Sequence, residues 1–425
     1  IAYDELFHFM TKLIVRSFCC SSLPSRNRCA ELRLGAAAVR RHFLGSGKIS
    51  ILTAPSTSEQ AGYRLLRRFC KRQSAPMPPL PLCGAAKLEE RNKAMKKILL
   101  IGTGGTIASE MGESGLTPEL TSQQLLRYIP DIEDICDVRC LQLFSLDSTN
   151  IQPKHWVRVA DAIRERYGEY DGFVVSHGTD TMAYTAAALS YLIQRSPKPI
   201  VLTGAQKPIG FETTDSKQNL RDAFTVAASD MTGVVLVFNG KVILGTRARK
   251  TRSKSFEAFS SINYPVLALV QDGRLIRYIR PECAPEPIFS DRVDDKVALL
   301  KLIPGTDCGV VDYLLERNDA LIIESFGVGG LPTYKAGDFY QAVKRGLDQG
   351  KTVVMTTQVE NEGSDLSVYH VGTVIKRDLP ILEAYDMTTE AVTAKLMWLL
   401  GQTRDQGEVA RRFYVPVASD ILAVK

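Results

Sequence analysis

Two apolar stretches of this chain each end in a short run of glycines and hydroxyl residues. Residues 98–101 continue into Gly102-Thr103-Gly104-Gly105-Thr106, and residues 173–175 continue into Ser176-His177-Gly178-Thr179-Asp180. Such uninterrupted apolar runs are typical of parallel strands buried on both faces. Ligands of open α/β sheets bind at the carboxyl ends of their strands. The sequence therefore predicts an α/β fold with a pocket in which a threonine carries out covalent chemistry.

Strand-like and helical segments alternate from residue 95 onward. Residues 153–167, for example, carry apolar side chains at the spacing of one helical face. This alternation indicates parallel sheets covered by helices. The expected strands are residues 172–176, 199–203, 233–238, 297–302, 320–324 and 352–356, and the expected helices are residues 153–167, 181–194, 215–228, 310–317, 335–347 and 388–400.

A proline-rich stretch, residues 280–287, separates a larger unit from a smaller one. We therefore expect a two-domain α/β protein. Its larger N-terminal domain, with a parallel sheet and flanking helices, spans residues 95–280. A linker follows over residues 281–296, and a smaller C-terminal α/β domain spans residues 297–425.

Residues 1–94 have a different composition from the rest of the chain. They hold 16 Lys and Arg against 6 Asp and Glu, a net charge of +10, whereas the remainder carries −4. They show no sustained apolar periodicity, so we expect a poorly structured extension. Their low acid content is also typical of an organellar transit peptide. A third interpretation, favoured by Met95-Lys96-Lys97 before the first strand, is that they are translated from upstream of the real start.

Cysteine usage and hydropathy exclude several classes of protein. The nine cysteines have no regular spacing, which argues against a disulfide framework. Cys136 and Cys140 have no histidine beside them, so no metal site is predicted. There is no run of 18 uncharged apolar residues, and we expect no membrane span. Reduced thiols and a cytoplasmic location are the expectation.

The chain resembles the L-asparaginase family, in its cytoplasmic (type I) branch. The resemblance runs from about Met95 to near the C-terminus and is carried, in order, by GGTIAS at 104–109, DST at 147–149, HGTDT at 177–181, LTGAQ at 202–206, GTRARK at 245–250, SINYP at 261–265, GVGG at 327–330 and DMT at 386–388. It implies hydrolysis of L-asparagine to L-aspartate and ammonia, without a cofactor, in a homodimer or homotetramer. The implied partner is this small molecule, with neither nucleic acid nor membrane involved.

Thr106 is the nucleophile that the resemblance implies. A threonine hydroxyl attacks only with help from a base and a positioned electrophile. Gly105 beside it allows a backbone N–H to approach a substrate oxygen, as an oxyanion hole requires. A phosphate-binding glycine turn is the alternative, but Ile107 occupies the third glycine position of that pattern.

Thr179, Asp180 and Lys250 complete the implied catalytic set. A carboxylate such as that of Asp180 holds a substrate ammonium well, and a lysine can relay a proton when burial disfavours its charged form. The alternatives are a helix N-cap at Thr179 and Asp180 and a solvated basic face around Lys250. His177 is expected to be packed and hydrogen-bonded rather than a base. The flanking Arg247, Arg249 and Arg252 are expected at the surface or at a subunit contact.

Ser148 and Thr149 occupy the positions that bind the substrate α-carboxylate in the family that the chain resembles. The alternative is that these two residues only form an ST-turn in a loop. The chain departs from the family pattern in its lid, where Ser114-Gly115-Leu116-Thr117-Pro118 contains no tyrosine. Tyr369 matches a second-domain tyrosine that assists from a neighbouring subunit. Glu324 stands where enzymes with an allosteric asparagine site have an arginine, which argues against that effector mechanism.

Two other functions fit parts of this sequence. The archaeal glutamyl-tRNA amidotransferase subunit shares the catalytic core and carries an N-terminal β-barrel, whose alternating strands residues 1–94 lack. An amino-acid-binding regulator would need neither a nucleophile nor a lysine relay. Retention of both favours the enzyme.

Overall fold

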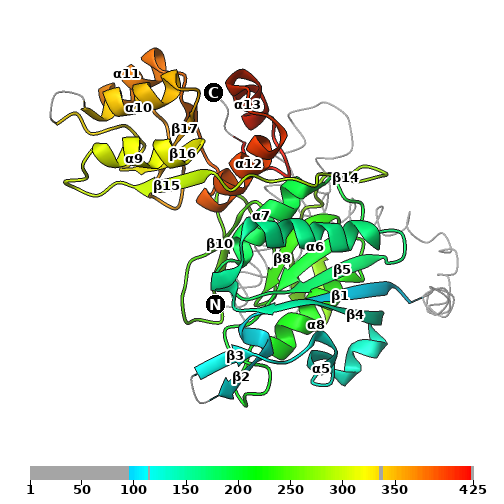
Figure 1. The fold of residues 1–425 in the computed structure, drawn as a ribbon. Coiled ribbons are helices and arrows are strands. Elements are labelled where there is room, and N and C mark those ends of the chain that lie inside the picture. The colour runs from blue at the N-terminus through cyan, green and yellow to red at the C-terminus, as the bar shows by residue number, and fades with distance from the viewer. Residues whose placement is uncertain (1–94, 113–114, 335–337, 423–425) are drawn as a thin grey trace, which may run out of the picture. The chain divides into compact units, whose positions relative to one another are not determined.

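The structure, a computed structural model, describes residues 95–112, 115–334 and 338–422. The extension expected over residues 1–94 lies outside these residues. The described chain contains one large and one smaller sheet, each with helices packed against it (Figure 1). This confirms the expected α/β class with a larger N-terminal and a smaller C-terminal domain.

The large sheet has eight strands. They are β1 (Lys97–Gly104), β4 (Asp137–Leu146), β5 (Gly172–Ser176), β7 (Pro199–Thr203), β8 (Gly233–Phe238), β9 (Lys241–Leu244), β12 (Ala268–Gln271) and β13 (Arg274–Arg277). Their order is β13-β12-β9-β8-β7-β5-β1-β4. Strands β4, β1, β5, β7 and β8 pair in parallel. Strands β9, β12 and β13 extend the sheet with antiparallel pairs. The carboxyl ends of β1, β5 and β7 therefore meet at one edge.

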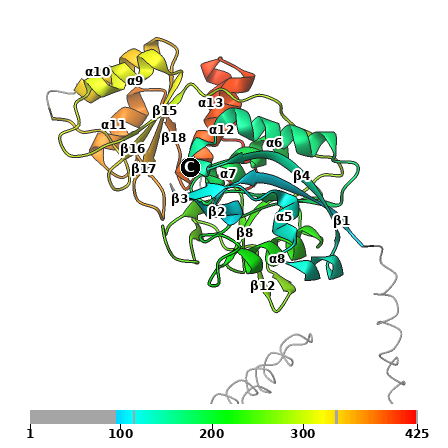
Figure 2. The ribbon, with the colours of Figure 1, turned by 60° about the horizontal axis from the view of Figure 1, so that its bottom comes forward.

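Both faces of the central strands β1, β5, β7 and β8 are buried, as the continuous apolar runs predict. Along β1, Leu99 and Ile101 belong to one core, and Ile98 and Leu100 to the other. The first core includes side chains of α6 (Pro153–Glu165) and α7 (Met182–Leu192), and the second those of α5 (Ser122–Leu126) and α8 (Ser216–Ala227). The turned view shows these helix pairs on opposite sides of the strands (Figure 2).

The smaller sheet is parallel and has four strands in the order β15-β16-β17-β18. Its strands are β15 (Val297–Lys301), β16 (Ala320–Ser325), β17 (Thr352–Thr357) and β18 (Leu382–Glu383). The helices of this half are α9 (Gly309–Arg317), α10 (Asp338–Asp348), α11 (His370–Asp378), α12 (Thr389–Gln402) and α13 (Gln406–Phe413). Within the expected linker, β14 (Ile288–Phe289) pairs with β6 (Ile193–Gln194).

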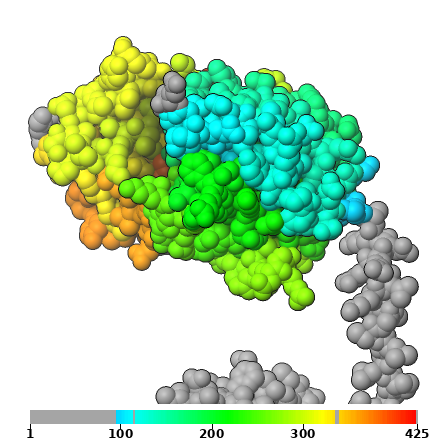
Figure 3. All heavy atoms as spheres, turned by 90° about the horizontal axis from the view of Figure 1, so that it is seen from below, coloured from blue at the N-terminus to red at the C-terminus, as the bar shows by residue number. Residues whose placement is uncertain are grey.

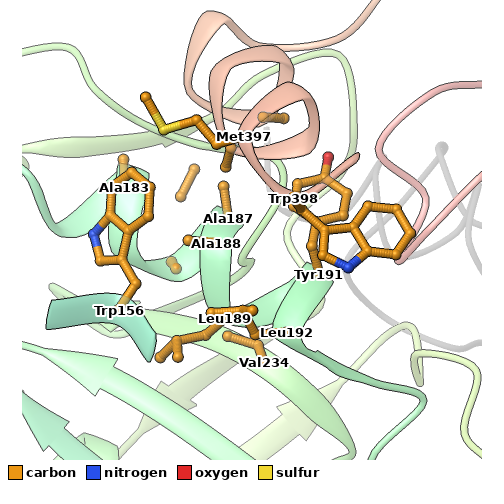
Figure 4. Packing of buried hydrophobic residues seen from close by; sticks show 14 of the residues in the cluster. Trp156, Ala183, Ala187, Ala188, Leu189, Tyr191, Leu192, Val234, Met397 and Trp398 are labelled. Carbon is orange, nitrogen blue, oxygen red and sulfur yellow. The ribbon is translucent and has the colours of Figure 1, made fainter. Parts of the chain in front are cut away.

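Helix α12 joins the two halves by packing on α7. Met397 and Trp398 of α12 face the alanine-rich surface of α7 (Figure 4). The ring of Trp398 stacks on that of Tyr191, with centroids 5.8 Å apart and planes at 14°. One hydrophobic core therefore runs from the large sheet through α7 and α12 to β16 and β17.

Most of the remaining elements lie near the carboxyl edge of the large sheet. They are η2 (Thr106–Ala108), the hairpin strands β2 (Ser109–Gly112) and β3 (Gly115–Pro118), η4 (Ser148–Asn150), and the paired strands β10 (Ala248–Lys250) and β11 (Phe259–Ser261). In contrast, η3 (Pro130–Asp134) precedes β4 at the amino edge. Figure 3 shows one face of the molecule. On it, residues near the start of the described chain, in cyan, lie next to residues from its middle, in bright green. Within the described residues, the helices are too short or too polar to cross a bilayer.

Candidate active site

The turns that follow β1 and β5 touch through their glycines. A Cβ atom placed on Gly105 would lie 2.2 Å from the backbone nitrogen of Gly178, which no real side chain can do. Gly105 also has a φ of +79°, a conformation that favours glycine. Both glycines are therefore needed for this close approach, which brings the segments of Thr106 and Thr179 together.

Lys250 reaches the second of these turns from the end of β10. Its Nζ donates a hydrogen bond of 2.8 Å to Thr179 Oγ1 and one of 2.6 Å to Asp180 Oδ1. The Lys250 side chain is only 17% exposed, whereas that of Asp180 is 58% exposed. The interpretation of Lys250 as part of a solvated basic face is therefore wrong.

The alternative of a simple helix cap at Thr179 and Asp180 is also wrong. The N-cap residue of α7 is Thr181, and it makes no side-chain capping hydrogen bond. The Thr181 hydroxyl instead donates to the carbonyl of Ser148 at 2.8 Å. The Asp180 carboxylate thus accepts from Lys250 while its exposed side remains open to a ligand.

Thr106 is half-buried and begins η2, directly after Gly105. The Gly105 N–H donates to the carbonyl of Leu146 at 2.9 Å. Because this donor is already used within the chain, an oxyanion at the site would have to be held by other N–H groups of the two turns. Gly105 contributes the close backbone approach.

Ser148 and Thr149 lie after β4 and differ in their surroundings. Ser148 is buried, and its Oγ would lie 2.6 Å from a Cβ placed on Gly178. It therefore packs against the turn that carries Thr179. Thr149 is exposed, and both its N–H and its hydroxyl donate to Asp147 Oδ1, at 2.8 and 2.7 Å. The Asp147 carboxylate is thus the acceptor of this local turn, which is an Asx-turn centred on Asp147 and not the ST-turn of the alternative.

His177 is packed into the core, as expected. Its Nδ1 lies 2.7 Å from the carbonyl of Gly178 and its Nε2 lies 3.0 Å from the hydroxyl of Thr185. Burial lowers the pKa of His177 to about 4, although the contact with the Gly178 carbonyl acts in the opposite direction. The ring is neutral at physiological pH, and its contact with the Gly178 carbonyl stabilises the turn that carries Thr179.

The expectation that the arginines beside Lys250 lie at the surface is wrong for Arg247. This side chain is fully buried and donates to the carbonyl oxygens of Asp386 and Ser419 and to Asp386 Oδ2. Arg249 is half-buried near Glu360 and Glu390. The guanidinium of Arg247 satisfies backbone carbonyls of the C-terminal segment, a contact that charge patterning along the sequence cannot reveal.

Two further predicted positions lie in the smaller domain. Tyr369 precedes α11 and is 60% exposed, and among the described residues its hydroxyl makes no hydrogen bond with Thr106, Thr179 or Lys250 of the same chain. Glu324 is buried at the end of β16, where its Oε1 accepts a hydrogen bond of 2.6 Å from Thr389.

Gln206 is a residue of this site that sequence reasoning did not single out as functional. It follows β7, and its Oε1 lies 3.3 Å from the hydroxyl of Thr179. The available signal was its position directly after Gly204-Ala205, at the carboxyl end of a third buried strand.

Known families match both halves of the chain. The family described as "Asparaginase, N-terminal" matches residues 97–282, and "Glutaminase/Asparaginase C-terminal domain" matches residues 296–413. A solved structure, the thermostable L-asparaginase from Thermococcus kodakarensis, superposes with a TM-score of 0.73 at 38% identity, over 77% of this chain and all of that chain.

Individual relatives divide between two kinds of protein. L-asparaginase from Thermococcus kodakarensis is 39% identical over 76% of this chain and 99% of its own length. A glutamyl-tRNA(Gln) amidotransferase subunit from Pyrococcus furiosus is 34% identical over 79% of both chains. Both halves of the described structure thus have their counterparts in these proteins, and the chain belongs to the asparaginase family.

Proposed function

We propose that this protein is an L-asparaginase that hydrolyses L-asparagine to L-aspartate and ammonia through a threonine acyl-enzyme, without a cofactor. The observation that carries the proposal is the contact of Lys250 with both Thr179 and Asp180, 2.8 and 2.6 Å away. This contact forms beside the turn of Thr106 because Gly105 and Gly178 touch.

In the first half of this reaction, Thr106 Oγ attacks the side-chain amide carbon of asparagine. As the C–O bond forms, the proton of the hydroxyl passes through the polar groups of the site to the amide nitrogen, and N–H groups of the two turns hold the oxyanion. Breaking the C–N bond then releases ammonia and leaves an ester on Thr106. The Asp180 carboxylate holds the substrate ammonium, and Ser148 and Thr149 bind its α-carboxylate.

In the second half, a water molecule attacks the ester. Thr179 and the Lys250–Asp180 pair orient this water and pass on its proton. Cleavage of the ester bond returns the hydroxyl to Thr106 and yields aspartate. This division of one difficult step into two easier ones is the usual benefit of a covalent nucleophile.

The second candidate is one component of a tRNA-dependent amidotransferase, favoured by the relatives that carry the glutamyl-tRNA(Gln) amidotransferase name. Against it, the chain covers 79% of the length of the Pyrococcus furiosus relative but 99% of an L-asparaginase. The two functions differ in their need for tRNA. A free-standing asparaginase releases ammonia from asparagine alone.

We also propose that a second copy of the chain completes the site, in a homodimer or homotetramer. The hairpin β2–β3 is the nearest lid to Thr106, and the sequence between Thr106 and Tyr128 has no tyrosine. Tyr369 is a strongly exposed phenol at the start of α11. It is the residue that a second copy would contribute.

The test is ammonia release by the purified full chain with asparagine or glutamine, in the presence and absence of tRNA. The asparaginase proposal predicts turnover of asparagine without tRNA. An amide activity that appears only with glutamyl-tRNA and partner proteins would replace it with the amidotransferase function. Binding of asparagine without release of ammonia would indicate a regulator.

A further inference from the structure

We infer that Gln206 is a positioning residue that orients the Thr179 hydroxyl toward Lys250. Gln206 acts through Thr179 and Lys250, so this inference rests on the proposed function of the same site. The inference is based on a row of hydrogen bonds from Lys250 through Thr179 and Gln206 to the Ser255 carbonyl. At its two ends, the ammonium group can only donate and the carbonyl oxygen can only accept.

The first fixed role is that of Lys250. An ammonium group can only donate, so Thr179 Oγ1 accepts the 2.8 Å hydrogen bond from Nζ. The single proton of the Thr179 hydroxyl must therefore point elsewhere. The acceptor that lies within reach is Gln206 Oε1, at 3.3 Å.

The second fixed role is that of the Gln206 amide. Its Nε2 donates to the carbonyl oxygen of Ser255 at 3.1 Å. A carbonyl oxygen only accepts, so the amide nitrogen must face Ser255 and the amide oxygen must face Thr179. The Ser255 carbonyl thus selects the orientation in which Gln206 can receive the Thr179 proton.

The backbone of Gln206 is held in place for this contact. The buried Asp215 carboxylate accepts from the Gln206 N–H with both oxygens, at 3.1 and 3.0 Å. Gly204 lies so close to the previous turn that a Cβ there would be 2.2 Å from the His177 carbonyl oxygen. The loop after β7 is therefore locked against the loop that carries Thr179.

The direction in which the Thr179 hydroxyl proton points affects the proposed proton relay. While Gln206 accepts the Thr179 proton, a lone pair of that hydroxyl faces Lys250. Gln206 thus holds the arrangement in which Thr179 accepts from Lys250, and a misdirected hydroxyl would slow the proton relay.

The test compares two substitutions at Gln206 with a matched control. Gln206→Met keeps the length but removes both hydrogen bonds, and Gln206→Glu keeps the acceptor but adds a negative charge. The control is Gln406→Met, because Gln406 is also half-buried and donates to the carbonyls of Leu347 and Lys351, at the start of α13. All variants are made in the full chain.

Gln206→Met should lower kcat by about 10- to 100-fold, because it leaves the relay misaligned. KM should stay within about threefold of the original, since Gln206 holds the hydroxyl rather than the substrate. Gln406→Met should change neither. In Gln206→Glu, a carboxylate oxygen can still accept the Thr179 proton, so kcat should fall less than in Gln206→Met.

A second readout does not depend on activity. Crystal structures of the full-chain variants give the distance between Thr179 Oγ1 and Lys250 Nζ, which is 2.8 Å in the unsubstituted chain. In Gln206→Met the Thr179 hydroxyl should move out of hydrogen-bond distance of Lys250, whereas Gln406→Met should keep this contact. The inference is overturned if Gln206→Met matches Gln406→Met in kcat, or if the contact between Thr179 and Lys250 is unchanged in Gln206→Met.

The two proposals fail in different ways. Absence of asparagine hydrolysis by the unsubstituted chain would refute the proposed function, and the crystal structures of the variants would still decide the role of Gln206. Normal hydrolysis by Gln206→Met, with an unaltered contact between Thr179 and Lys250, would refute the role of Gln206 alone.

Discussion

Arg247 and Asp386 form an ion pair across 139 positions of sequence, with Nη2 and Oδ2 2.8 Å apart. The Arg247 side chain is fully buried and that of Asp386 is 11% exposed. Arg247 directly precedes β10, the strand that ends in Lys250. The same ion pair that fastens the C-terminal segment therefore also anchors the strand of the candidate catalytic lysine.

Loss of this anchor should destabilise the protein. Arg247→Met removes the charged partner of the buried Asp386 carboxylate and the donor to the Ser419 carbonyl, which costs about 3–5 kcal/mol. The Leu422 N–H still donates to Asp386 Oδ1. Arg252→Met is the control, because Arg252 is 48% exposed and changes there are usually within about 0.5 kcal/mol. Urea unfolding at neutral pH measures both. Equal midpoints for the two variants would show that the buried pair contributes nothing. Should Arg247→Met not fold, Arg247→Lys should still give an intermediate midpoint.

Lys250 and Arg252 should also differ in their effects on activity. Lys250→Met removes the donor to Thr179 and Asp180, so kcat should fall by about 100-fold or more. Arg252→Ala should be nearly silent. Turnover of asparagine by each variant at two salt concentrations checks this. Similar losses at both positions, with a strong dependence on salt, would instead indicate an anion-binding patch.

The buried His177 makes the stability depend on pH. Burial lowers its pKa from 6.5 to about 4, so between these values the unfolded chain binds the proton and the folded chain does not. The stabilisation is complete above pH 6.5 and is lost as the pH falls toward 4. At pH 5 this loss amounts to about 2 kcal/mol relative to pH 7.

His177→Gln tests this contribution, because glutamine keeps a hydrogen-bonding side chain but does not titrate. Its unfolding free energy should fall about 2 kcal/mol less between pH 7 and pH 5 than that of the original chain. Asp222, whose pKa burial raises to about 6, acts in the opposite direction in both proteins and cancels in the comparison. Parallel pH profiles of the two proteins would assign the acid sensitivity to other groups.

Tyr369 should matter only in an assembled protein. Tyr369→Phe removes an exposed hydroxyl, so the fold and the urea midpoint should be unchanged, whereas kcat should fall by about 10-fold or more if a partner's phenol assists the reaction. Analytical ultracentrifugation at the assay concentration gives the oligomeric state. A fully active monomer would remove this role.

The elements that the sequence predicted best are those with both faces buried. Strands β5, β7 and β8 have the expected bounds, because each is a continuous apolar run ended by a polar residue: Ser176, Thr203 and Asn239. Strand β4 was not predicted. It is an edge strand of mixed polarity whose side chains are mostly half-buried, so it lacks both the continuous and the alternating pattern.

The residues of the candidate site also differ in how well the sequence predicted their positions. The positions of Thr106, Thr179 and Asp180 follow from strand ends, which local sequence reveals. The contact of Lys250 with Thr179 spans 71 positions and depends on the pairing of β10 with β11, a short ribbon with no pattern of its own. The burial of Arg247 could not be foreseen, because its partners are backbone carbonyls of a distant segment.

The central claim is that Thr106 forms the covalent bond. Thr106→Val keeps the shape of the side chain without the hydroxyl, and Thr106→Ser keeps a hydroxyl without the methyl group. The most direct measurement is rapid quenching of the full chain with asparagine, followed by peptide mass spectrometry, together with kcat of both variants. We predict an aspartyl ester on the peptide that contains Thr106, a loss of several orders of magnitude in Thr106→Val, and partial activity in Thr106→Ser. A Thr106→Val variant that keeps a tenth of the original turnover, or an ester found on Thr179 instead, would contradict this mechanism.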